Sequence, residues 1–94
     1  DQYIANMCDG ALAGFKYFDL SETKEIAVMI KGHAEGILYV RTSETGEAVA
    51  AIAVSSSKVL KEFKSAMHPC GSKEALFFTF EGKGSFDFVS FTLR

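Results

Sequence analysis

EALFFTFEGKGSFDFVSFTL, residues 74–93, contains two runs in which aromatic side chains alternate with other residues. A period of two is typical of a β-strand that packs one face against a core. Residues 74–81 and 86–93 therefore predict two strands, and the glycine-rich residues 82–85 predict a tight hairpin loop between them. Phenylalanines of the two strands would then meet across the pair, which stabilises a sheet beyond the area that they bury.

The same period continues upstream of this segment. Residues 14–20, 25–31 and 36–42 each predict a strand, and in the second of these Ile26, Val28 and Ile30 share one face. Residues 43–46 (SETG) end in a glycine and predict a turn. This turn would join the strand at 36–42 to residues 47–54 as a hairpin.

One stretch has a different spacing. Val59, Leu60, Phe63 and Met67 are spaced as on the apolar face of an amphipathic helix, and Pro69 would end that helix. Pattern alone therefore leaves two fold classes open, an all-β sandwich and an α+β domain with one helix near residues 58–67.

The composition argues against several classes of protein. The 94 residues suffice for a single domain, 1–94, and 48% of them are hydrophobic, without any Trp. The formal net charge of −2 argues against a nucleic-acid binder, which usually has a basic face. The apolar and aromatic content argues against disorder, and no apolar run approaches the ~20 residues of a membrane helix.

The residue patterns indicate no catalytic apparatus. His33 and His68 have no partners at ligand spacing, so both are interpreted as solvated loop residues, and the serines form no nucleophile elbow. Cys8 and Cys70 are 62 positions apart and leave three readings open: two free thiols, one disulfide in a secreted protein, or a metal site.

Two segments resemble family 6 carbohydrate-binding modules. Residues 6–20, NMCDGALAGFKYFDL, are similar to that family's N-x-x-(N/D)-G-D-W-x-x-Y-x-x-V-D-F segment. Residues 75–91, ALFFTFEGKGSFDFVSF, are similar to its closing L-Y-L-V-F-x-G-x-G-x-F-N-F-D-W-F segment. The order of these segments, with the hairpin between them, extends the resemblance over most of the chain.

The resemblance implies an all-β fold, an antiparallel β-sandwich of the jelly-roll, galactose-binding-like type. Residues 57–67 would then be a strand rather than a helix. The family's first strand has no counterpart here, so we expect the chain to be a piece of a longer protein, truncated at its start. The missing strand would leave an unpaired sheet edge, through which we expect a homodimer.

The function that the resemblance implies is non-catalytic binding of a polysaccharide such as xylan or arabinoxylan. Such modules are attached to xylan-degrading glycoside hydrolases, so the expected partners are the glycan and the parent catalytic domain, and the expected location is extracellular or at the cell surface. The alternative is a structural sandwich that packs on the parent domain and has a degenerate sugar site.

The resemblance also points to candidate site residues, in loops at one end of the sandwich. These candidates are Tyr3, Asn6, Asp9, Phe63, Lys83 and Asp87. The sequence departs from the family at this end, since Leu60 stands near the loop Trp and Asp87 replaces the ligand-binding Asn. Val89 replaces the Asp of the family's calcium site, so no calcium or other cofactor is expected.

Two further expectations follow from the same comparison of motifs. Tyr17 and Tyr39, on strand faces, are alternatives for a site on the concave face of a sheet. Cys8 and Cys70 would lie at opposite ends of the sandwich, which predicts two free thiols.

Overall fold

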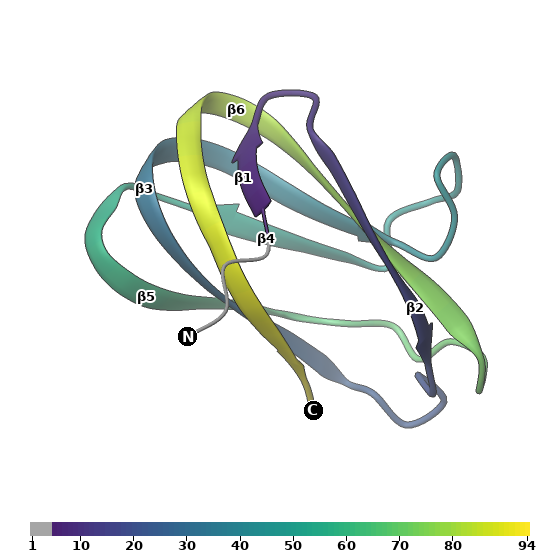
Figure 1. The fold of residues 1–94 in the computed structure, drawn as a ribbon. Coiled ribbons are helices and arrows are strands. Elements are labelled where there is room, and N and C mark those ends of the chain that lie inside the picture. Colours follow the sequence, from purple (N-terminus) through teal and green to yellow (C-terminus); the bar gives the residue numbers. More distant parts are fainter. Residues whose placement is uncertain (1–4) are drawn as a thin grey trace.

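The computed structural model describes residues 5–94, which form a β-sandwich of six strands (Figure 1). The strands are β1 (Ala5–Cys8), β2 (Leu12–Phe18), β3 (Glu25–Arg41), β4 (Ala50–Val54), β5 (Ser57–Ala66) and β6 (Glu74–Leu93). No helix occurs in residues 5–94, so the all-β, antiparallel prediction is confirmed.

Both layers of the sandwich are built on one long ribbon, in which β3 and β6 pair antiparallel from Ile26–Leu93 to Arg41–Phe77. The ribbon curves over the top of the molecule, so that its two halves lie in different layers (Figure 1). The first layer has the order β2-β6-β3-β4, and the second layer has the order β1-β6-β3-β5.

The bend occurs where glycines of the two strands face each other. Gly36 is the register partner of Gly82, and the backbones there are so close that a Cβ on Gly36 would clash with the carbonyl oxygen of Glu81. A Cβ on Gly82 would clash in the same way with the carbonyl oxygen of Glu35. Only glycine therefore permits the close approach of the two strands.

The bend stacks the phenylalanines of β6 on one another. Phe78 and Phe88 are fully buried with ring centroids 4.9 Å apart, and Phe80 and Phe86 are 5.0 Å apart in edge-to-face geometry. The predicted contact between the two aromatic runs is thus present. The predicted hairpin at residues 82–85 is wrong, because β6 is one continuous strand whose halves belong to opposite layers and do not pair with each other.

Other predicted boundaries also change. The strands expected at 25–31 and 36–42 are parts of the single strand β3, and Ile26, Val28 and Ile30 do share a buried face. The hairpin from β3 to β4 is present, with pairs from Val40–Ala50 to Gly36–Val54.

The stretch with helical spacing is the strand β5, so the helical alternative is wrong. β5 pairs with β3 in pairs such as Val28–Phe63 and Met29–Glu62, and these hydrogen bonds replace those that a helix would form internally. The ladder continues past its end, where the amide of Met67 donates to the carbonyl of Lys24 at 2.8 Å. Pairing with a central strand outweighs a local preference.

The two cysteines are free and lie at opposite ends of the sandwich, as predicted. Cys8 faces Ser85 next to the bend, whereas the amide of Cys70 donates to the carbonyl of Leu20 in the loops at the other end. Among the described residues, none forms a helix long and apolar enough for a membrane span.

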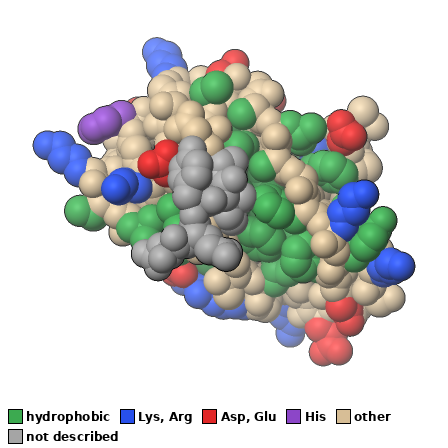
Figure 2. Space-filling model, in the orientation of Figure 1, with side chains coloured by type: hydrophobic (Ala, Val, Ile, Leu, Met, Phe, Trp, Pro, Cys, Tyr) green, Lys and Arg blue, Asp and Glu red, His purple; other side chains and the backbone are tan. Residues whose placement is uncertain are grey.

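One side of the sandwich has a continuous apolar surface, seen in the middle of Figure 2 between β6 and β2. Phe15, Phe18 and Phe91 are half-buried and pack against the core, with ring centroids 5.4 Å apart for Phe15–Phe91 and 5.6 Å apart for Phe18–Phe91. These three rings extend the core to the surface.

Replacing a glycine of the bend tests its role. We expect Gly36→Ala to lower the free energy of unfolding by about 2–3 kcal/mol, because backbone must move to admit the methyl group. Gly46→Ala is the control, since its Cβ would meet only the Ser43 side chain, and it should change stability by less than about 0.5 kcal/mol. Urea denaturation measures both, and equal effects would contradict a packing constraint at the bend.

Candidate functional site

The bend brings several turns together at one end of the molecule, here named the corner end. It consists of the turn between β1 and β2, the bent parts of β3 and β6, and the connection from β4 to β5. Register places these segments side by side, since Gly36 pairs with both Gly82 and Val54, and Gly32 pairs with Ser57. In Figure 2 charged side chains gather at the upper left, where the ribbon bends.

Two candidate residues contact each other directly. Asn6 on β1 and Asp87 on β6 are register partners, and Asn6 Nδ2 donates to Asp87 Oδ1 at 3.3 Å and to the carbonyl oxygen of Phe86 at 3.4 Å. The neighbouring side chains of Met7, Phe86 and Phe88 are buried, so strand alternation directs Asn6 and Asp87 to the outer face.

The row continues through Lys31, Val59 and Leu60, of which sequence reasoning singled out only Leu60, near the loop Trp of the resembling family. Lys31 on β3 is the register partner of Asp87 on its other side. Beyond Lys31 the ladder between β3 and β5 is irregular, and Val59 and Leu60 lie in that part of β5 with exposed fractions of 68% and 37%. An amide, a carboxylate, an ammonium and an aliphatic surface therefore follow one another across the second layer, and we name Asn6, Asp87, Lys31, Val59 and Leu60 the corner row.

Asp9 and Lys83 lie at the same end. Asp9 Oδ1 accepts a hydrogen bond from the backbone amide of Gly82 at 3.0 Å, which ties the first turn to the bend in β6. Lys83 faces Glu35 in register, and both line a shallow hollow of about 360 Å³ with His33, Ala34, Ser56 and Gly84. Neither His33 nor Lys83 has an ion-pair partner among residues 5–94.

Two candidates do not join this group. Phe63 lies in the middle of β5 opposite Val28, where it is half-buried against the core, and Lys61 Nζ lies 5.2 Å from the centroid of its ring. Its position indicates a role in packing. Tyr3 lies outside the described residues.

The alternative site on a strand face has a different character. Tyr39 is half-buried on the outer face of the first layer opposite Thr79, and the Arg41 guanidinium lies 5.2 Å from its ring centroid. Arg41 is itself held by Thr79 Oγ1 at 2.7 Å and by the carbonyl of Gly46 at 3.0 Å. Tyr17 is 58% exposed on β2 and has Lys73 Nζ 5.0 Å from its ring.

The described residues contain no group of three or more His, Cys, Asp or Glu side chains that could hold a metal ion. The polar groups of the corner row are suited to other chemistry. An amide both donates and accepts, a carboxylate accepts, and an ammonium donates, so together they can bind a ligand rich in hydroxyl groups.

No known family model matches the sequence. The chain is 42% identical over 91 residues to a xylosidase/arabinosidase of Thermoclostridium stercorarium. These residues are 97% of this chain but only 19% of that protein, so the chain spans about a fifth of its relative.

Two solved structures share the architecture. A family 6 carbohydrate-binding module from Clostridium cellulolyticum, in complex with xylose, has a TM-score of 0.83 at 17% identity and covers 92% of this chain and 73% of its own. A glycoside hydrolase family 43 arabinoxylan arabinofuranohydrolase from Bacillus subtilis, in complex with cellotetraose, has a TM-score of 0.82 at 18% identity. It covers 94% of this chain and 20% of its own.

The chain therefore has the β-sandwich fold of family 6 carbohydrate-binding modules. The resemblance found in residues 6–20 and 75–91 is confirmed at the level of the fold, and the sequence relative is a xylosidase/arabinosidase.

Asp9 can be tested for a structural role. We expect Asp9→Ala to lower the free energy of unfolding by about 1 kcal/mol, because the Gly82 amide loses its acceptor. Asp9→Asn retains an acceptor oxygen at that position and should lose less. Urea denaturation of the three proteins measures the difference, and unchanged stability in Asp9→Ala would mean that the contact contributes nothing to folding.

Proposed function

We propose that the chain is a non-catalytic polysaccharide-binding module of a xylan-degrading glycoside hydrolase. The observation that supports it best is the corner row, in which Asn6 and Asp87 are held together on the outer face by register and a hydrogen bond. The fold, the xylosidase/arabinosidase relative and the sugars bound by the two similar structures support the same class.

The chemistry of a sugar explains why such a row would bind one. A pyranose ring has apolar C–H faces and a rim of hydroxyl groups that need fixed polar partners. Asp87 would accept hydrogen bonds from hydroxyl groups, and hydrogen bonds to a charged group are stronger than neutral ones. Asn6 Oδ1 would accept from a neighbouring hydroxyl, because Asp87 and the carbonyl of Phe86 already hold both hydrogens of its amide nitrogen and orient the group.

The apolar part of the proposed site is aliphatic. Val59 and Leu60 are exposed next to the polar groups, in the region where the family has an aromatic ring. Aliphatic groups bury less area than an aromatic ring and provide no flat π face. We therefore expect weak binding to a single sugar and detectable binding to a polymer, whose successive units offer the same contact repeatedly.

We further propose xylan or arabinoxylan as the glycan, in line with the relative's name, and a location outside the cell or at its surface, where such polymers are found. Val89 occupies the position of the calcium-binding Asp in the resembling family, so binding in this chain is proposed to need no metal ion.

Affinity electrophoresis in gels containing xylan, arabinoxylan or β-glucan tests the proposal. We expect retardation by at least one polymer, and Asp87→Ala should weaken it by about tenfold or more, since hydrogen bonds to a charged group contribute ~1.5–3 kcal/mol. Asp87→Asn, which keeps one acceptor oxygen and adds the amide donor of the ligand-binding Asn in the resembling family, should retain binding. Asp19→Ala is the matched control, because Asp19 is exposed in a loop at the other end of the sandwich. Among the described residues, its carboxylate accepts hydrogen bonds only from the amide and hydroxyl of Ser21.

Chelation tests the metal-free part of the proposal. We expect retardation to be unchanged after treatment with EDTA, because no described cluster offers a cation site. Repeating the gel with added Ca²⁺ provides the control. Binding that disappears with EDTA and returns with Ca²⁺ would contradict this part while leaving glycan binding in place.

The absence of retardation on every glycan would instead favour the packing alternative. The half-buried rings of Phe15, Phe18 and Phe91 form the apolar surface that would then lie against the parent catalytic domain. Asp87 lies in the corner row and outside that apolar surface. A substitution of Asp87 therefore tests glycan binding separately from packing on the parent domain.

A further inference from the structure

β4 is an edge strand without the protection that edges usually have. Among residues 5–94 it pairs only with β3, and residues 48–54, AVAAIAV, contain neither a charge nor a proline. The side chains on its outer face are those of Ala51 and Ala53, both small and exposed. Natural proteins usually interrupt such a strand with lysine, proline or a bulge, because a flat edge is a template for another strand.

The backbone of β4 also has free hydrogen-bonding groups. The carbonyl of Val40 accepts from the amide of Val49 at 2.7 Å, so Val40 directs its polar groups toward β4. In an antiparallel ladder alternate residues do so, which places the amides and carbonyls of Ala51 and Ala53 on the side away from β3. Within residues 5–94 no hydrogen bond reaches these groups.

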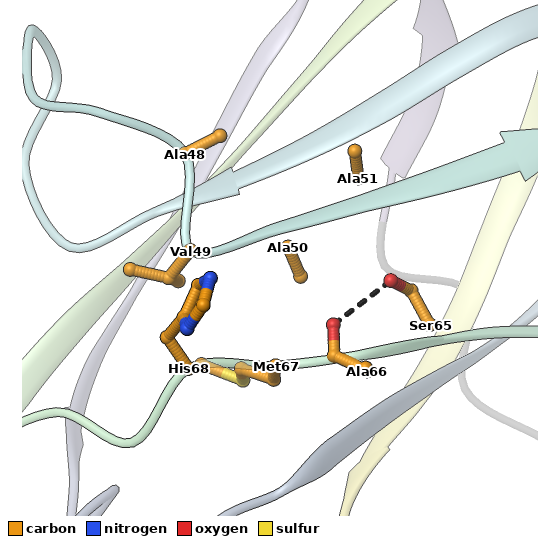
Figure 3. Close-up of a pocket in the computed structure, with 8 residues that line it drawn as sticks. All are labelled: Ala48, Val49, Ala50, Ala51, Ser65, Ala66, Met67 and His68. Atoms are coloured by element: carbon orange, nitrogen blue, oxygen red, sulfur yellow. Dashed lines mark hydrogen bonds between the residues drawn. The ribbon is translucent and has the colours of Figure 1, made fainter.

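The space beside this edge is open. A groove of about 320 Å³ lies between the start of β4 and the end of β5. It is lined by Ala48–Ala51 on one side and by Ser65–His68 on the other (Figure 3). The amide of His68 donates to the carbonyl of Val49 at 3.1 Å and so covers only the beginning of the edge. Beyond Val49, the alternate residues Ala51 and Ala53 are exposed.

The edge of β5 is charged, unlike the edge of β4. Lys58, Lys61 and Lys64 are all exposed along it, and lysine on an edge strand opposes pairing with a second chain. Of these two edges, β4 and not β5 is therefore suited to pairing with a further strand.

We propose that β4 pairs antiparallel with β4 of a second copy of this chain, about a two-fold axis through Ile52. In this register Ala51 faces Ala53 of the other copy, and each such pair exchanges both of its backbone hydrogen bonds. The strand is self-complementary because it has no charge to repel its copy and only methyl groups on the outer face. The inference does not depend on the proposed function.

A pair of double variants tests the register. Ala51→Lys with Ala53→Lys places like charges opposite each other twice in the dimer, whereas Ala51→Lys with Ala53→Glu places opposite charges there. Directly opposed like charges destabilise a sheet and opposed unlike charges stabilise it, so the dissociation constants should differ by about tenfold or more. The two variants have the same exposed positions and number of substitutions, and circular dichroism checks that both fold.

Sedimentation equilibrium of the unaltered chain and both variants, from about 10 µM to about 1 mM, provides the measurement. We expect a weak dimer of the unaltered chain, a weaker one for the Lys/Lys variant and a tighter one for the Lys/Glu variant. In the same range of concentration, exchange of the Ala51 and Ala53 amides should slow as the dimer forms. A monomer at every concentration, or variants that associate equally, would overturn the proposal, and association without slower exchange at these amides would place the interface elsewhere.

Discussion

The close contact of two backbones at Gly36 and Gly82 is the constraint on which the rest of the structure depends. It lets a single antiparallel ribbon of β3 and β6 turn over itself and supply the central strands of both layers. Phe78 and Phe80 then lie over Phe88 and Phe86, although all four belong to one strand. The core of this short chain is built from this folded strand, which is how so few residues enclose an aromatic interior.

The same contact determines where polar residues gather. Because both strands bend at the same place, the adjoining turns collect at one end, and Asp9 is fixed there by the Gly82 amide. Asn6 and Asp87, far apart in sequence, become neighbours because β1 pairs with β6 just beyond the bend. The corner row is therefore a consequence of the fold rather than of any local motif.

Much of the fold could be predicted from period alone. Alternation correctly placed Ile26, Val28 and Ile30 on a buried face and indicated strands on both sides of residues 82–85. It could not show that the strands are continuous, because a Gly-Lys-Gly segment is equally typical of a hairpin loop and of a bend. The difference depends on glycines at the facing positions of β3, and such long-range register is not visible in a local window.

For residues 57–67 the strand that the resemblance implied is confirmed, and the helix suggested by the local spacing is wrong for a related reason. Their apolar spacing fits a helix. The hydrogen bonds that these residues form with β3 stabilise a strand by more than the local spacing favours a helix.

Some candidate site residues lie together in the structure and others do not. The alternation of strand faces and the register between strands explain which ones do. Asn6 and Asp87 followed from the order of motifs, and the structure places them in contact. Phe63 faces the interior because it is opposite the buried Val28, a relation that depends on the register of β5 against β3. Lys31 was missed because a lysine at a strand end resembles any solvated residue until its partner Asp87 is known.

The absence of Trp links the two proposals in this protein. A sugar site with an aliphatic surface gains little per contact, so useful retention on a polymer requires several contacts at once. β4 lies at the edge of the first layer, whereas the corner row lies on the outer face of the second layer. A dimer formed through β4 would therefore leave Asn6 and Asp87 of both copies accessible, because they lie on β1 and β6. Two weak sites in one particle can hold a repeating polymer far more firmly than either site alone.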